Sequence, residues 1–266
     1  KIFSFTRFTE LVDTLEQFGT YYFSLSGGEP FTVKDIIRYI DYVSRRIPYT
    51  HVVTNGYLLN EKMVRELADT SLKEISISLD GNQQLHDRLR NQPGAYNMVW
   101  EAIQNLRKIA PEIRIIVNST ILSENLESLT DINQQLNDIG VEHKFQAVTE
   151  HPLFDGQMDR AIKYTFDDRG LTRLETFCAE MIKRPNVMNS RFYLKHVPLL
   201  YKNKLKGVLG KKCLLGYHHI ELLPDGTVFP CLTGMDWRNG FEVETSYNNL
   251  ISSQQYENKV KLLHGC

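Results

Sequence analysis

Short apolar runs alternate with amphipathic helical patterns along residues 8 to 148, and this alternation limits the possible folds more than any other feature. The runs read as five strands, and the residues between them show apolar positions at helical spacing. The predicted strands are Tyr21–Leu25, His51–Thr54, Glu74–Leu79, Ile113–Asn118 and Val141–Val148. Because strands joined by crossover helices pair in parallel, we expect an α/β fold built on a parallel sheet, open or barrel-like.

Local signals indicate where some of the helices begin. Thr32, followed three residues later by Asp35, predicts the cap of one helix in a capping-box arrangement. Asn60 predicts the cap of a second, shorter helix. The segment 82–94 is polar and predicts a loop, in which His86 reads as a surface residue.

Three of the predicted strands end in small or polar residues. These ends are Gly27-Gly28-Glu29-Pro30, Thr54-Asn55-Gly56 and Asp80-Gly81. The carboxyl ends of parallel strands lie at one edge of the sheet, where α/β folds bind ligands, so we expect a single rim. The two glycines expose bare backbone to a ligand, and Glu29 suits a positive group such as an amino acid's ammonium. The alternative for this first motif is a tight turn with a solvated glutamate.

The overall composition excludes several classes of protein. The 266 residues are 42% hydrophobic and 24% charged, as in ordinary globular proteins. The net charge of −1 does not indicate a nucleic-acid partner, and no apolar run reaches the roughly 18 residues of a membrane span. Four cysteines are too few for a disulfide scaffold of this length, so we expect a reducing compartment, the cytoplasm.

The cysteines indicate a metal or cluster site near the carboxyl end. Cys213 and Cys231 flank a predicted hairpin over residues 220–230, in the pattern Cys-x12-Gly-x4-Cys. Paired thiolates in a reducing compartment are more often metal or cluster ligands than disulfides. Zinc is the alternative, although the Cys-x2–4-Cys pairs typical of zinc sites are absent. Cys266 is a candidate third ligand, whereas Cys178 lies on an apolar helical face and reads as a buried core thiol.

Jointly, these motifs resemble the radical S-adenosylmethionine (radical SAM) enzymes that carry a C-terminal auxiliary iron–sulfur domain of the SPASM or twitch type. The resemblance rests on Gly27–Pro30, Thr54–Gly56, Ser76–Gly81 followed by His86-Asp87 and Arg90, and the Cys213–Cys231 hairpin, in the family's order. It implies a partial (β/α)6 TIM-like barrel of parallel strands plus a small C-terminal β-hairpin domain. The implied domains are residues 1–150 for the barrel, 151–206 for a helical connector and 207–266 for a truncated auxiliary-cluster domain.

The same resemblance implies a site for S-adenosylmethionine on the strand-end rim. Gly27, Gly28, Glu29 and Pro30 would hold the methionine ammonium, Ser78 and Arg90 would contact the ribose and the methionine carboxylate, and Thr54, Asn55 and Asp80 would line the same rim. A guanidinium suits a carboxylate because the two groups form paired hydrogen bonds. The alternative is that Arg90 is a solvated loop charge and Ser78 a strand-end cap.

One motif of the family is absent from the sequence. The Cys-x3-Cys-x2-Cys motif that binds the catalytic [4Fe–4S] cluster follows the first strand in family members, and both would fall before Lys1. We therefore expect a sequence without its amino-terminal portion, in which the ligands of that cluster lie outside this chain. The competing explanation is a degenerate homologue that has lost the cluster. At the carboxyl end the resemblance implies one or two auxiliary [4Fe–4S] clusters, with Cys213, Cys231 and Cys266 as ligands.

The activity that the resemblance implies is that of an oxidoreductase working by radical chemistry. Such an enzyme cleaves S-adenosylmethionine reductively to a 5′-deoxyadenosyl radical, which abstracts a hydrogen atom from the substrate. The implied substrate is a peptide or protein, or else a sugar- or nucleotide-type metabolite, and the implied reductant is a flavodoxin or ferredoxin. A non-enzymatic metal-binding scaffold is the alternative from another class. A conventional transferase is disfavoured because it has no need of the cysteine hairpin.

Overall fold

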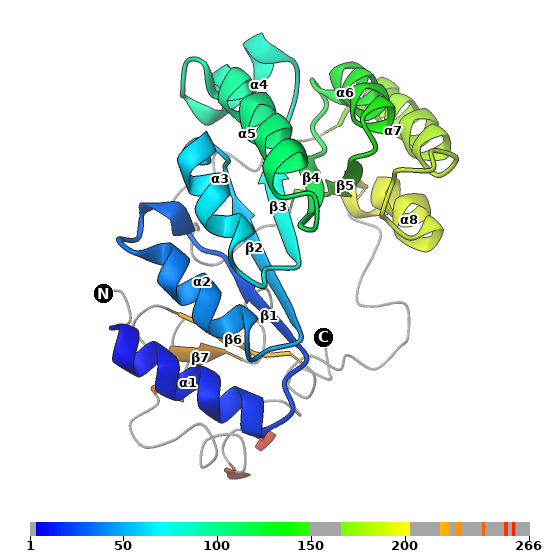
Figure 1. Cartoon of the computed structure of the whole chain (residues 1–266). Coiled ribbons are helices and arrows are strands. Elements are labelled where there is room, and N and C mark those ends of the chain that lie inside the picture. Colours follow the sequence, from blue (N-terminus) through cyan, green and yellow to red (C-terminus); the bar gives the residue numbers. More distant parts are fainter. Residues whose placement is uncertain are drawn as a thin grey trace. The chain divides into compact units, whose positions relative to one another are not determined.

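The computed structural model describes residues 4–148, 166–202, 219–223, 227–229, 241–242, 253–254 and 257–258. The chain divides into two compact units, of which the larger comprises residues 15–148 and 166–198. This unit contains a parallel sheet of five strands in chain order, β1-β2-β3-β4-β5 (Figure 1). The predicted α/β fold with a parallel sheet is therefore confirmed.

The strands fall within two residues of the predicted runs. They are β1 (Tyr22–Leu25), β2 (Tyr49–Thr54), β3 (Glu74–Ser78), β4 (Arg114–Thr120) and β5 (Glu142–Gln146). Their register aligns Thr54 with Ile77, and Ser78 with Asn118. The carboxyl ends of neighbouring strands therefore lie beside one another, as the sequence predicted for the rim.

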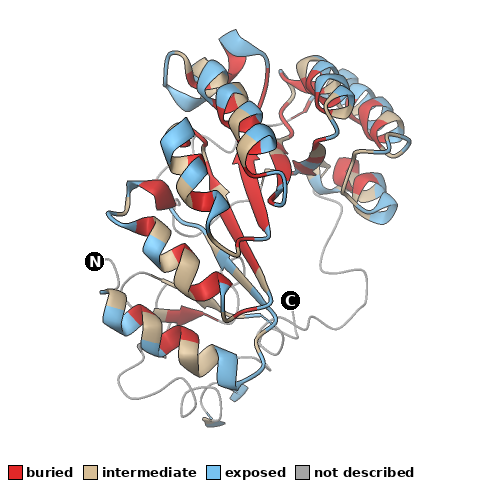
Figure 2. Cartoon of the chain, in the orientation of Figure 1, coloured by how far each residue is buried: buried red, intermediate tan, exposed pale blue. Residues whose placement is uncertain are grey.

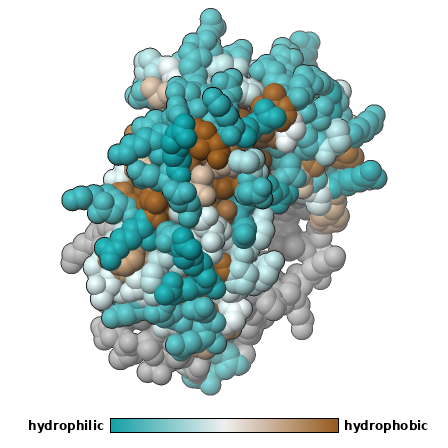
Figure 3. Space-filling model, in the orientation of Figure 1, coloured by the Kyte–Doolittle hydropathy of each residue, from teal (hydrophilic) through white to brown (hydrophobic). Residues whose placement is uncertain are grey.

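Helices cover one face of this sheet (Figure 1). The helices that begin in this unit are α2 (Ile36–Ser44), α3 (Glu61–Ala68), α4 (Gln83–Arg90), α5 (Ala95–Ile109), α6 (Leu126–Asp138), α7 (Asp168–Met181) and α8 (Arg191–Tyr201), whereas α1 (Phe5–Gln17) begins in the other unit. Val52, Ile75 and Val117 are fully buried, and buried residues concentrate on the central strands and on one side of the helices (Figure 2). The surface shown in Figure 3 is mostly hydrophilic, with small separate apolar areas.

The predicted cap at Thr32 is wrong. Residues Pro30–Thr32 form a 3-10 helix, which Glu29 caps by accepting a hydrogen bond from the backbone N–H of Phe31. The Thr32 hydroxyl donates to the carbonyl oxygen of Glu29 at 2.6 Å, so it is not available to cap a later helix. Helix α2 begins only after Asp35, whose side chain makes no capping hydrogen bond.

The predicted loop at residues 82–94 is also wrong, because residues 83–90 form helix α4. Asn82 caps this helix by accepting a hydrogen bond from the N–H of Leu85 at 3.1 Å, and Asn91 ends it in a left-handed conformation. Only Leu85 and His86 are buried along α4. Two adjacent buried residues leave too weak a sequence pattern to distinguish a helix from a polar loop.

Two other local predictions are confirmed. Asn60 caps α3 by accepting a hydrogen bond from the N–H of Met63 at 2.9 Å. Cys178 is buried on α7, and burial raises the pKa of its thiol to about 12 because the thiolate would lose its hydration. A thiol in this state is inert, as expected for a core residue.

The carboxyl-terminal part contains a small antiparallel sheet in the order β6-β7-β8. Its strands are β6 (Glu221–Leu222), β7 (Thr227–Phe229) and β8 (Phe241–Glu242). The pairing of Glu221 with Phe229 agrees with the predicted hairpin, whereas β8 was not predicted. Cys213, Cys231 and Cys266 lie outside the described residues, as does the turn at 224–226. The domain division at residues 150 and 206 stays a prediction.

Candidate functional site

The carboxylate of Glu29 links the ends of β1 and β2. Its Oε1 accepts hydrogen bonds from the Thr54 hydroxyl at 2.7 Å and from the Phe31 N–H at 3.1 Å. Its Oε2 accepts a hydrogen bond from the Asn55 N–H at 2.7 Å. The structure thus brings together three residues that the sequence placed on one rim, and Glu29 is a fixed acceptor rather than a freely solvated side chain.

The two glycines before Glu29 present bare backbone at the end of β1. Gly27 adopts a φ of +141°, which side-chain-bearing residues rarely adopt. Gly27 and Gly28 are exposed, and no atom lies within 4 Å of where a Cβ on either residue would stand. Pro30 is buried and starts the 3-10 helix. A ligand at this edge would therefore meet peptide groups directly.

The turn after β2 is held by its own side chains. The Thr54 hydroxyl accepts a hydrogen bond from the Gly56 N–H, and Asn55 Oδ1 accepts one from the Tyr57 N–H, both at 3.0 Å. Gly56 has a φ of +83°, and a Cβ there would stand 2.8 Å from Cγ2 of Ile77. The turn is therefore pressed against β3, which fixes the position of Asn55.

Gly56→Ala is expected to lower the free energy of unfolding by about 3 kcal/mol, because it adds backbone strain and an overpacked methyl group. Gly140→Ala is the matched control, since Gly140 also has a positive φ, +67°, but a Cβ there would have no atom within 4 Å. We expect a loss of only about 1 kcal/mol there. Urea unfolding measures the free energy of unfolding of both variants. Equal losses of stability would show that the contact with Ile77 is unimportant.

Asp80 forms the centre of the second half of the rim. Its Oδ1 accepts a hydrogen bond from the Thr120 N–H at 2.8 Å, and its Oδ2 pairs with Nη2 of Arg90 at 2.5 Å. Its carbonyl oxygen accepts a hydrogen bond from the buried Asn125 side chain at 2.8 Å. Arg90 is thus the paired last residue of α4, which contradicts the alternative of a solvated loop charge.

The predicted surface position of His86 is wrong. The residue is fully buried, and its Nδ1 accepts a hydrogen bond from the Asp80 N–H at 3.1 Å. Burial lowers the pKa of the imidazole to about 4, because the charged form would lose its hydration. The neighbouring Asp87 caps α5 by accepting hydrogen bonds from the N–H groups of Gly94 and Tyr96. His86 therefore supports the backbone of Asp80, and Asp87 supports the start of α5.

Polar atoms without partners lie close to this rim. Ser78 ends β3 beside Asn118, whose buried Oδ1 has no hydrogen-bond partner among the described residues, and the same holds for the Tyr57 hydroxyl. Burial raises the pKa of Tyr57, and Arg90 and Glu29 are among the charges that act on it. Because buried polar atoms are normally paired, these atoms fit a rim that receives a polar ligand.

The donors and acceptors on the rim match the groups of S-adenosylmethionine. Glu29 offers a carboxylate to an ammonium, Arg90 offers a guanidinium to a carboxylate, and Ser78 offers a hydroxyl to a ribose. The bare backbone at Gly27 leaves space for the ligand. Within the described residues, no three His, Cys, Asp or Glu side chains gather into a metal site.

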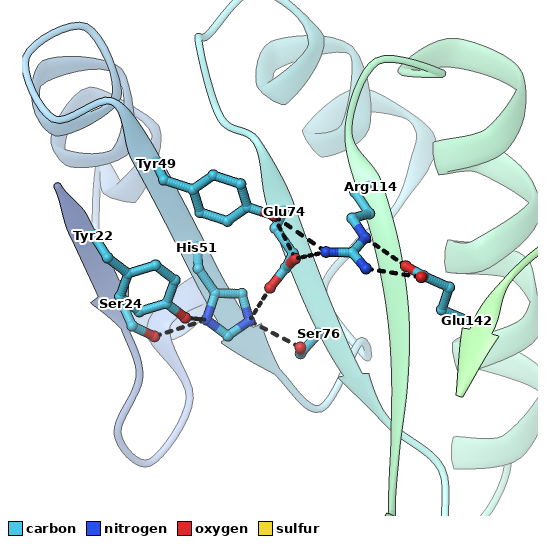
Figure 4. Close-up of polar contacts among 8 residues, drawn as sticks. All are labelled: Tyr22, Ser24, Tyr49, His51, Glu74, Ser76, Arg114 and Glu142. Atoms are coloured by element: carbon cyan, nitrogen blue, oxygen red, sulfur yellow. Dashed lines mark hydrogen bonds and ion pairs between the residues drawn. The ribbon is translucent and has the colours of Figure 1, made fainter. Parts of the chain in front are cut away.

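A polar network on the sheet face opposite the helices escaped the sequence reasoning (Figure 4). The hydroxyls of Tyr22 and Ser24 lie 2.7 and 2.9 Å from Nδ1 of His51. On the other side of the ring, Nε2 lies 2.8 Å from the Ser76 hydroxyl and 3.7 Å from Oε1 of Glu74. The alternation of these residues with apolar ones along three strands indicates a polar sheet face, but not which side chains pair across it.

The network continues across the sheet through an ion cluster (Figure 4). Oε2 of Glu74 accepts hydrogen bonds from the Tyr49 hydroxyl at 2.6 Å and from Nη1 of Arg114 at 2.9 Å. Arg114 also binds Glu142 through two hydrogen bonds, which raise its pKa. Inward-facing residues of (β/α) barrels are usually bulky and apolar. This face instead carries polar side chains that pair with one another, and His51, Glu74 and Ser76 among them are buried.

The comparisons with known proteins identify the family of the chain. The model of the Radical SAM superfamily matches residues 2–136. The AdoMet-dependent heme synthase of Methanosarcina barkeri is 26% identical over 237 residues, which cover 83% of this chain and 65% of that protein. The PqqA peptide cyclase of Bradyrhizobium diazoefficiens is 26% identical over 239 residues, which cover 86% of this chain and 60% of that protein.

A solved structure shows the same fold. The crystal structure of Streptococcus suis SuiB bound to S-adenosylmethionine matches with a TM-score of 0.69 at 15% identity, covering 98% of this chain and 61% of that chain. This chain therefore spans less than two thirds of the length of these three proteins. Since the family model matches more than half of the 266 residues, the chain belongs to the radical SAM superfamily.

Proposed function

We propose that this chain is the S-adenosylmethionine-binding part of a radical SAM enzyme that modifies a peptide. The observation that carries the proposal is the fixed carboxylate of Glu29, which stands at the open end of β1 beside exposed glycine backbone. The family match supports the cofactor, and the relation to a PqqA peptide cyclase supports the substrate class. A sugar- or nucleotide-type metabolite is the second substrate class.

Each rim residue has a defined task in this proposal. Glu29 accepts hydrogen bonds from the ammonium of the cofactor, with its orientation set by Thr54 and Asn55. Arg90 binds the methionine carboxylate, and Ser78 binds the ribose. The backbone of Gly27–Pro30 lies along the amino-acid end. When bound, S-adenosylmethionine supplies the 5′-deoxyadenosyl radical that removes a hydrogen atom from the substrate.

The substrate is proposed to lie against the polar sheet face that carries His51. Burial lowers the pKa of His51, so its ring is neutral near pH 7. Glu74 favours the proton on Nε2, which leaves the lone pair of Nδ1 to accept a hydrogen bond. The hydroxyls of Tyr22 and Ser24 face that single lone pair and also hydrogen-bond each other, and both residues lie on the exposed first strand, where a polar substrate group is proposed to meet them.

The carboxyl-terminal region is proposed to bind one or two auxiliary [4Fe–4S] clusters through Cys213, Cys231 and Cys266. The antiparallel β6–β7 pairing supports a hairpin between the first two cysteines. The catalytic cluster would have its ligands outside this chain. A cytoplasmic flavodoxin or ferredoxin would supply the electron. None of the described helices is long and apolar enough to cross a lipid bilayer.

Anaerobic reconstitution of the complete gene product tests the proposal. The protein is loaded with iron and sulfide, reduced with dithionite and incubated with S-adenosylmethionine, and 5′-deoxyadenosine is measured by mass spectrometry. We expect 5′-deoxyadenosine from the wild-type protein and a strong reduction with Glu29→Gln. A fully iron-loaded protein that forms none would instead be a metal-binding scaffold. Loss of iron from Cys213→Ala would support the auxiliary site.

A further inference from the structure

The Asp80 side chain is almost completely buried, and both of its carboxylate oxygens are bound by groups of the protein. Only 7% of it is exposed. One carboxylate oxygen is held by the Thr120 N–H of β4 and the other by Nη2 of Arg90. The backbone of Asp80 is held as well, by Nδ1 of His86 and by the Asn125 side chain. Asp80 is therefore fixed from three elements and presents no free face to a ligand.

Among the described residues, the Arg90 guanidinium makes a hydrogen bond through one nitrogen only. Its Nη2 pairs with Asp80, while its side chain remains 33% exposed. A guanidinium is planar and carries five N–H donors. Holding one nitrogen therefore limits the positions that the planar group can take, and the donors that Asp80 does not use remain available at the exposed side.

We propose that Asp80 is a positioning residue for the amino-acid end of the cofactor. It makes no contact with S-adenosylmethionine, and it acts by holding the Arg90 guanidinium in the orientation that receives the methionine carboxylate. This inference rests on the proposed function. It revises the expectation from the sequence, in which Asp80 itself lined the cofactor site.

The direction of the effect distinguishes positioning from simple electrostatics. If Asp80 acted only through its charge, its removal would strengthen the binding of an anionic carboxylate, because like charges repel. If Asp80 orients Arg90, its removal weakens that binding, because the freed guanidinium must be ordered when the ligand binds. A loss confined to ligands with the carboxylate is therefore the signature of positioning.

The test measures two ligands by equilibrium dialysis on the complete, cluster-reconstituted gene product. S-adenosylhomocysteine carries the amino-acid carboxylate, and its decarboxylated analogue keeps the adenosine, the thioether and the ammonium. We expect Asp80→Asn to weaken the binding of S-adenosylhomocysteine about tenfold, by analogy with the loss seen when a residue that orients a metal-binding side chain is replaced. The affinity for the decarboxylated analogue should stay within about twofold.

A double-mutant cycle shows whether Asp80 acts through Arg90. Arg90→Gln should cause the same selective loss, and adding Asp80→Asn to it should cause no further loss, since residues in one network are not additive. Asp87→Asn is the matched control. It removes a carboxylate from the same helix, but Asp87 caps α5 and does not touch Arg90, so the affinity should not change.

The possible outcomes separate the inference from the proposed function. Wild-type protein that does not bind S-adenosylhomocysteine would overturn both. Wild-type binding combined with an unchanged or stronger affinity in Asp80→Asn would overturn the inference alone, as would an equal loss for both ligands. Should Asp80→Asn fail to fold, Asp80→Glu keeps the charge but displaces it, and the same selective loss is expected. Melting temperatures check the folding of each variant.

Discussion

Glu29→Gln is expected to lower the affinity of the complete protein for S-adenosylhomocysteine by a factor of about 10 to 100. The substitution removes the negative charge that would face the ligand's ammonium, and hydrogen bonds to charged groups contribute about 1.5–3 kcal/mol. The new amide nitrogen would also face the donors of Thr54 or Asn55, which now bind the carboxylate. Equilibrium dialysis under anaerobic conditions measures the affinity.

The control for this variant is Glu66→Gln on α3. Glu66 is a surface carboxylate paired with Lys62, so the same substitution changes the net charge equally without touching the rim. We expect its affinity to equal that of the wild-type protein. If Glu29→Gln retained full affinity and lowered only the melting temperature, Glu29 would be a structural residue that joins β1 to β2.

Acidification from pH 7 to pH 5 is expected to destabilise the metal-free protein by about 2 kcal/mol for each of two buried histidines. His143 is fully buried, and its pKa is lowered to about 3 by burial. The pKa of His86 is lowered to about 4. Both folded-state values lie below the unfolded value of about 6.5, so the unfolded chain binds more protons. The stabilisation is therefore complete above about pH 6.5 and is lost as the pH falls.

The contacts of His143 explain why it stays neutral. The Ser119 hydroxyl donates to the carbonyl oxygen of Leu79 and lies 2.8 Å from Nε2 of His143, so that nitrogen acts as the donor. On the other side, Nδ1 faces the Asn133 side-chain amide nitrogen at 3.4 Å. A second proton on Nδ1 would therefore meet a donor and no solvent.

Urea unfolding at several pH values tests this prediction. His143→Gln is expected to be less stable than the wild-type protein at pH 7, but to lose about 2 kcal/mol less on acidification, because one of the titrating groups is gone. The control is Leu174→Ala on α7, which removes a buried side chain that does not titrate and should therefore lower the stability without changing its pH dependence. An unchanged pH dependence in His143→Gln would show that His143 does not control acid stability.

The sequence by itself determined the strand–helix alternation and the position of the rim. The strands lie within two residues of the predicted runs because apolar strands and amphipathic helices are periodic over short distances. Glu29, Thr54 and Asn55 could be placed together because parallel strands bring their carboxyl ends to one edge. The Asn60 cap was predictable for a similar reason, since it depends on residues only three positions apart.

Only the tertiary structure decided how the side chains on that rim are used. The burial of His86, the pairing of Arg90 with Asp80 and the contact of Asp80 with Thr120 join residues of different elements. The His51 network likewise joins three strands that are about 25 residues apart. Such contacts leave no local pattern in the sequence, because they depend on the register of the sheet and on the packing of α4, and not on the spacing of neighbouring residues.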